Sequence, residues 1–94
     1  MERELPDRTK DFALRVIRMY TALPKSQVAV VLGNQVLRSG TSVGAHYREA
    51  YRSRSTAEVI SKLEVALQEL DETTYWFQLL IEAGVVALTG SKLC

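Results

Sequence analysis

Apolar residues recur along the chain at intervals of three and four, the spacing that places side chains on one face of an α-helix. Three such stretches, at about residues 7–23, 27–52 and 56–83, predict three helices. The third has the widest apolar face, because a second apolar series runs beside the first. The first series is Val59, Leu63, Ala66, Leu70, Phe77 and Leu80, with Thr73 as a polar gap, and the second is Ile60, Leu67, Trp76 and Ile81.

Residues typical of helix ends separate these stretches. Pro24 is predicted to end the first helix, and Gly84 can take the left-handed conformation that closes the third. The connections at residues 24–25 and 52–54 are so short that they imply antiparallel packing of consecutive helices, as in an up-down bundle. The predicted caps are Asp7, after a loose arm over residues 1–6, then Ser26, and Ser55 with Glu58 as a capping box.

The first and second helices each show an apolar face. In the middle of the second, residues 39–45 are nearly all small, and each of the two glycines there costs about 1 kcal/mol relative to alanine. We interpret this run as a close approach of another helix, with hydroxyls bonded to helix carbonyls. The alternative is a kink, whereas a phosphate loop is excluded because no strand or GK[ST] sequence is present. The predicted faces are Phe12, Val16, Met19, Tyr20 and Leu23 in the first helix, and Val28, Val31, Leu32, Val36, Val43 and Ala50 in the second.

Composition limits the class of protein. A chain of 94 residues, 47% hydrophobic, with two prolines and five glycines, is predicted to form one all-α domain over residues 1–94. No stretch has the length of a membrane span or the apolar core of a signal peptide. The lone Cys94 offers no disulfide or metal cluster, so we expect a cytoplasmic protein without metal or cofactor.

Charge is unevenly distributed. Residues 1–54 carry ten Lys/Arg and five Asp/Glu, whereas residues 55–94 carry two and six. The chain is therefore a basic half joined to an acidic half, although its net charge is only +1. This balance argues against a strongly polyanion-binding chain as a whole, but leaves room for a local basic surface.

Residues 37–86, LRSGTSVGAHYREAYRSRSTAEVISKLEVALQELDETTYWFQLLIEAGVV, resemble a known family. Its members are small four-helix-bundle proteins encoded in intervening sequences of bacterial 23S ribosomal RNA genes, and its relatives are the accessory variability proteins of diversity-generating retroelements. The segment DRTKDFALRVIRMYTALPKS fits the same pattern, so the resemblance covers about residues 7–88. It rests on a small-residue run, an Arg/Tyr-rich turn, a capped long helix and a Glu-Ala-Gly end.

The resemblance implies an all-α bundle that assembles into a ring-like homopentamer. The family's members have no established catalytic activity, and its retroelement relatives bind nucleic acid and a reverse transcriptase through a basic surface. The partners that this implies here are RNA, DNA or a nucleic-acid enzyme. The family's fourth helix should begin near residues 91–93. This chain stops there, so we expect a bundle of three antiparallel helices, truncated at the fourth, with a short tail over residues 85–94.

The candidate binding surface lies at the end of the second predicted helix. Arginine binds phosphate through two parallel hydrogen bonds and tyrosine can stack on bases, so a basic patch with aromatic residues suits nucleic acid. Alternatively, the arginines pair with acids of the third helix, Glu58, Glu64, Glu69, Asp71 and Glu72, and the surface forms subunit contacts in a purely structural module. The candidate residues are Arg38, Tyr47, Arg48, Tyr51, Arg52 and Arg54, which Arg15 and Arg18 could extend.

No catalytic constellation is evident. His46 is the lone histidine, and a contact with Glu49 one turn away is the simplest role for it. A di-iron bundle needs paired Glu-x-x-His motifs, and the sequence has one in reverse order, so we predict no metal site and no enzyme. Tyr75 and Trp76 fit either an oligomer contact or the core of the monomer.

Overall fold

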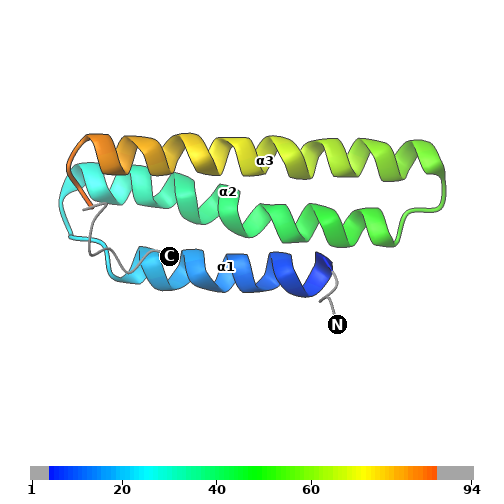
Figure 1. Cartoon of the computed structure of the whole chain (residues 1–94), viewed down its shortest axis with the longest axis horizontal. Coiled ribbons are helices and arrows are strands. Elements are labelled where there is room, and N and C mark those ends of the chain that lie inside the picture. Colours follow the sequence, from blue (N-terminus) through cyan, green and yellow to red (C-terminus); the bar gives the residue numbers. More distant parts are fainter. Residues whose placement is uncertain (1–4, 87–94) are drawn as a thin grey trace.

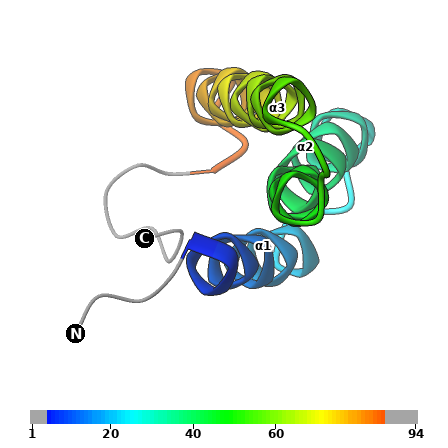
Figure 2. The same ribbon diagram turned by 90° about the vertical axis from the view of Figure 1, so that its right-hand side faces the viewer.

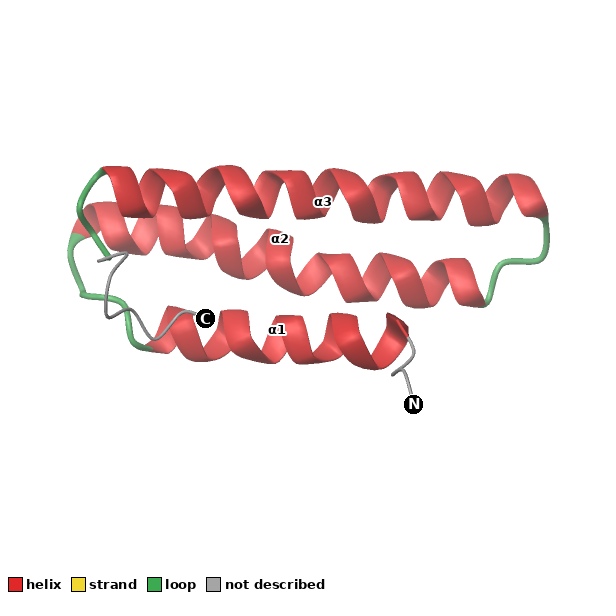
Figure 3. Cartoon of the chain, in the orientation of Figure 1, coloured by secondary structure: helices red, strands yellow, loops and turns green. Residues whose placement is uncertain are grey.

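The computed structural model describes residues 5–86, which form three helices joined by two short loops (Figure 1, Figure 3). The helices are α1 (Leu5–Thr21), α2 (Gln27–Tyr51) and α3 (Thr56–Glu82). Consecutive helices run antiparallel, and no strand occurs among the described residues. The all-α, up-down prediction is therefore confirmed. The predicted tail beyond residue 86, with the expected start of a fourth helix at residues 91–93, lies outside the described range.

The start of α1 differs from the prediction. The helix begins at Leu5, so Pro6 and Asp7 lie inside its first turn, and the predicted Asp7 cap is wrong. Proline is tolerated there because the first N–H groups of a helix have no intrahelical acceptor, and Asp7 suits the positive end of the helix. The end also comes early, at Thr21, whose hydroxyl donates to the Arg18 carbonyl (2.8 Å).

α2 lies at the centre of the packing. Figure 2 shows α1 and α3 on two sides of α2, and no other pair of described helices is in backbone contact. The predicted cap at Ser26 is confirmed, since its hydroxyl accepts a hydrogen bond from the Ala29 N–H (3.2 Å). Because α2 has two neighbours, its sequence must satisfy two contact surfaces at once.

The small residues of α2 let α1 approach closely. A Cβ atom added to Gly40 would lie 2.9 Å from Val16 Cγ2, and one on Gly44 would lie 3.1 Å from Thr9 Oγ1. Neighbouring hydroxyls donate to carbonyls one turn back, as Thr41 does to Leu37 (2.7 Å). The packing interpretation of residues 39–45 is therefore confirmed.

The apolar core joins all three helices near the α1–α2 loop. Val16, Met19 and Leu23 are buried as predicted for the first helix. The predicted face of the second helix is partly wrong, because Val28 and Val31 are 53% and 55% exposed. The residues that α2 buries are mostly smaller, since they face two helices: Ala29, Gly33, Val36, Ser39, Gly40, Val43, Gly44 and Ala50.

The face that α3 turns to α2 centres on Thr73. This residue, a polar gap in the sequence pattern, is 1% exposed, and its hydroxyl lies 2.9 Å from Ser39 Oγ and 2.7 Å from the Glu69 carbonyl. Ser39 in turn donates to the Gln35 carbonyl (2.8 Å). A pair of buried hydroxyls, each with an acceptor, therefore fixes α3 on α2.

Gly84 ends α3 as predicted. It has φ of 77°, in the left-handed region, and its N–H donates to the Ile81 carbonyl (3.0 Å). The next N–H, of Val85, donates to the Leu80 carbonyl (2.9 Å). These two bonds form a Schellman motif, which turns Val85 and Val86 back onto the core.

Candidate nucleic-acid interface

The α2–α3 hairpin projects beyond the first residue of α1 (Figure 1). α2 ends here because the N–H groups of Arg52 and Ser53 bond back to the carbonyls of Glu49 and Ala50 (3.2 and 3.1 Å). α3 then begins at the Ser55 cap, whose hydroxyl accepts from the Glu58 N–H (3.1 Å). The Glu58 carboxylate accepts from the N–H of Arg54, one residue before the position that a standard capping box uses.

Five of the six predicted binding residues lie at this end. Arg48, Tyr51, Arg52 and Arg54 are exposed, and we call these four the tip surface. Tyr47 is half-buried beside it, with its ring centroid 5.5 Å from that of Tyr51 and the two planes inclined by 37°. None of the ion pairs among the described residues uses Arg48, Arg52 or Arg54. The hairpin therefore presents three arginines around an aromatic pair.

Arg38 lies apart from the tip surface. Ten residues separate it from Arg48, which is about 15 Å along a helix. Its guanidinium donates to the carboxylates of Glu69 (Nη1–Oε1, 3.3 Å) and Glu72 on α3. Arg38 therefore forms ion pairs with acids of the third helix, which the sequence analysis gave as the alternative to nucleic-acid binding. Arg18 lies in the last turn of α1, at the other end of the bundle.

His46 lies between two carboxylates. Its Nδ1 is 3.6 Å from Glu49 Oε1 and its Nε2 is 3.7 Å from Glu69 Oε2. Glu49 also pairs with Lys62 Nζ (3.0 Å), a residue that the sequence reading missed. The signal for Lys62 was that it is the one basic residue in the third predicted helix, which otherwise carries acids.

This cluster ties α2 to α3 electrostatically. The hydrogen bond and charge of Lys62 lower the pKa of Glu49 below its ordinary value of 4.5, with a smaller contribution from His46. The predicted His46–Glu49 contact is confirmed. Within residues 5–86, no three His, Cys, Asp or Glu side chains are placed to hold a metal ion.

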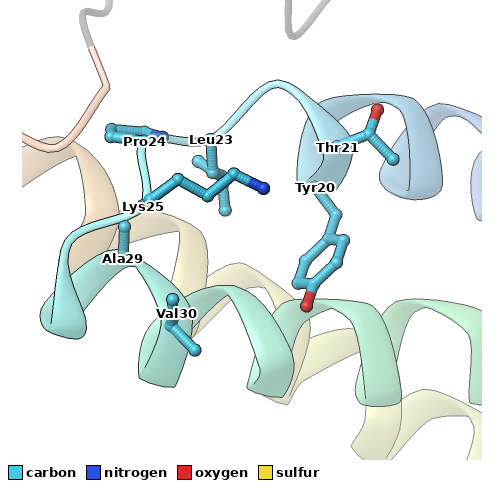
Figure 4. A pocket seen from close by; sticks show the side chains of 7 residues that line it. All are labelled: Tyr20, Thr21, Leu23, Pro24, Lys25, Ala29 and Val30. Atoms are coloured by element: carbon cyan, nitrogen blue, oxygen red, sulfur yellow. The ribbon is translucent and has the colours of Figure 1, made fainter.

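A shallow cavity opens at the α1–α2 corner (Figure 4). Tyr20, Lys25 and Val30 are among its lining residues, and the Tyr20 hydroxyl donates to Asn34 Oδ1 (2.7 Å). Its volume of about 200 Å³ is below the ~300–1,000 Å³ of small-molecule sites. None of the described helices is long and apolar enough to cross a membrane.

The fold and the tip surface define an all-α helical bundle with a projecting arginine–tyrosine hairpin. Comparison with protein families assigns it more narrowly. Residues 2–91 match the 23S rRNA-intervening sequence protein family, and the chain belongs to that family.

A solved structure agrees with this assignment. The chain is similar to a protein with unknown function from the S23 ribosomal protein family of Bacteroides thetaiotaomicron VPI-5482, with 41% sequence identity and a TM-score of 0.84. The match covers 90% of this chain and 79% of that one. Among curated proteins, none matches the chain.

Proposed function

We propose that this chain is a non-catalytic, self-associating helical-bundle protein that binds nucleic acid through the tip surface. The observation that carries the proposal is the contact between the tilted rings of Tyr47 and Tyr51, which Arg48 and Arg52 follow in sequence on a hairpin that projects from the bundle. An exposed tyrosine offers a stacking surface to an unpaired base, and flanking guanidinium groups suit the adjacent phosphates.

The charge balance of the hairpin supports this proposal. Residues 48–62 carry four basic side chains and two acidic ones. Both acids have local partners, since Glu49 pairs with Lys62 and Glu58 accepts from the Arg54 N–H. Arg38, whose charge is shared with Glu69 and Glu72, has less to offer a phosphate, and we leave it out of the tip surface.

The test is a salt titration of binding to a short, mixed-sequence single-stranded RNA. The double variant Arg48→Ala/Arg52→Ala should bind more weakly than the parent chain. Each phosphate contact contributes about 0.7 to the slope of log K against log salt for single strands, so losing two should flatten the slope by about 1.4. The matched control is Arg18→Ala/Lys25→Ala, which removes the same charge from exposed positions at the other end of the bundle.

Three outcomes separate the alternatives. A lower affinity and slope for the tip variant alone support the proposal. Equal effects in both double variants would indicate attraction by net charge without a defined surface, and would contradict it. Unchanged binding together with a changed solution mass would contradict the proposal and assign the tip surface to subunit contacts. Its arginines would then pair with acids of another subunit, as Arg38 pairs with Glu69 within one chain.

A further inference from the structure

Tyr51 gives the tip surface an aromatic ring that is supported by a neighbour and still largely exposed. Its ring centroid lies 5.5 Å from that of Tyr47, one turn earlier on α2, and this contact leaves Tyr51 63% exposed. Tyr47 itself is half-buried. A ring that an aromatic neighbour already holds loses little freedom when it stacks on a ligand. Tyr51 is therefore suited to stacking on a planar group that arrives from solvent.

Paired and unpaired bases differ in what they offer this ring. In a duplex each base is stacked between its neighbours, and the grooves present only the edges of the base pairs. An unpaired base can expose its face, and stacking on one aromatic side chain strengthens binding about 5- to 140-fold. Extracting a base from a duplex costs a comparable factor, which offsets that gain. Tyr51 therefore adds affinity for unpaired bases only.

The width of the hairpin end favours the same choice. This end contains the last turn of α2, the loop and the first turn of α3 (Figure 1). Packed helices have axes about 8–10 Å apart and are each about 10–12 Å across, so the end is about 20 Å wide. The grooves of B-DNA are about 12 Å and about 6 Å wide, and the major groove of an RNA duplex is deep and narrow. The end does not fit into these grooves, whereas a flexible single strand can follow its surface.

The arginines do not distinguish the two forms. Arg48 and Arg52 are four residues apart, Arg54 follows them, and all three are exposed. Duplexes and single strands both present phosphates, and contacts to phosphate carry no sequence information. The arginines should therefore attract both forms, and any preference between them has to come from the ring.

We propose that the tip surface selects unpaired nucleotides over duplexes, with Tyr51 stacked on one base and the arginines bound to the neighbouring phosphates. The inference rests on the proposed function and adds the class of nucleic acid that the site takes. It also assigns separate roles within the tip surface. The arginines determine the salt dependence of binding, and Tyr51 determines the preference for single strands.

The test compares three probes: a mixed-sequence single-stranded RNA, the same RNA annealed to its complement, and a single-stranded DNA of the same sequence. The parent chain should bind both single strands more tightly than the duplex. Tyr51→Ala should bind the single strands about 5- to 140-fold more weakly and the duplex equally well. Its salt slope should not change, because no charge is lost. Tyr51→Phe keeps the ring and should bind like the parent chain.

Tyr75→Ala is the matched control. Tyr75 is also an exposed tyrosine in an aromatic pair, 51% exposed and with its ring centroid 5.0 Å from that of Trp76. It lies near the other end of α3, about 29 Å along the helix from Thr56. The variant removes the same side chain away from the tip surface and should bind all three probes like the parent chain. Circular dichroism of each variant reports whether it remains folded.

The outcomes separate this inference from the proposed function. Equal affinity of the parent chain for duplex and single strand would overturn the inference, as would equal losses in Tyr51→Ala and Tyr75→Ala. The proposed function would still hold in either case if Arg48→Ala/Arg52→Ala weakened binding. A Tyr51→Ala loss that is the same on all three probes, or confined to RNA, would also overturn the inference, because stacking needs an unpaired base and no 2′-hydroxyl. Absence of binding to every probe would contradict the proposed function itself.

Discussion

The hydroxyls of Thr73 on α3 and Ser39 on α2 lie 2.9 Å apart at the centre of the helix packing, with Thr73 1% and Ser39 0% exposed. Ser39 donates to the Gln35 carbonyl, and the single hydroxyl proton of Thr73 has two acceptors within reach, Ser39 Oγ and the Glu69 carbonyl. Two polar residues thus occupy positions where an apolar series would be expected, and neither is left without a partner. The contact also fixes the register of α3 along α2.

We predict that Thr73→Val destabilises the fold by about 0.5–1.5 kcal/mol, the net value of a lost hydrogen bond. The shape of the side chain is kept, and Ser39 retains the Gln35 carbonyl as its acceptor. Chemical denaturation of the parent chain and the variant measures the difference. Thr74→Val is the matched control, because Thr74 is the next residue, is exposed and donates to the Leu70 carbonyl (3.2 Å). Equal losses in the two variants would contradict a special role for the buried pair.

The packing of Gly40 against Val16 predicts a different kind of sensitivity. Gly40→Ala should gain about 1 kcal/mol in helix propensity, yet we expect a net loss of stability because overpacking costs about 1–3 kcal/mol. The added Cβ would lie 2.9 and 3.0 Å from the two methyl carbons of Val16, a β-branched side chain with little rotamer freedom. Thermal unfolding of the variant measures the loss.

Val16→Ala supplies the control for that prediction. It removes the methyl groups that the new Cβ would meet, so the double variant Val16→Ala/Gly40→Ala should be more stable than the sum of the single effects by about 0.5–3 kcal/mol. Strict additivity would show that the alanine is accommodated without contact to Val16. The cost would then have another source.

The sequence predicted the three helices and their order because capping residues and helical periodicity are local signals. Ser26, Ser55 and Gly84 do what their residue types indicate. The burial of Thr73 and the exposure of Val28 could not be predicted in this way. Whether a residue is buried depends on which neighbour each face receives, and α2 divides its surface between two helices.

The candidate site likewise contains one contact that local sequence could predict and one that it could not. Tyr47 and Tyr51 are four residues apart on one helix, so their contact follows from helix geometry. Arg38 pairs with Glu69 and Glu72, more than thirty residues away in sequence. Such a pair depends on the register between α2 and α3, which the buried hydroxyls set and the apolar pattern alone does not reveal.

The Glu49–Lys62 pair predicts a pH-dependent stability. Because the fold lowers the pKa of Glu49 below 4.5, ionised Glu49 stabilises the fold above that pH, and the contribution disappears as the pH falls through the lowered value. Glu49→Gln lacks this contribution, so its melting temperature should lie below that of the parent chain near neutral pH and converge with it from about pH 7 to about pH 3. Glu64→Gln, at an exposed position of α3, is the matched control and should show less convergence. A gap for Glu49→Gln that persists at the acid end would mean that Lys62 does not stabilise the ionised carboxylate.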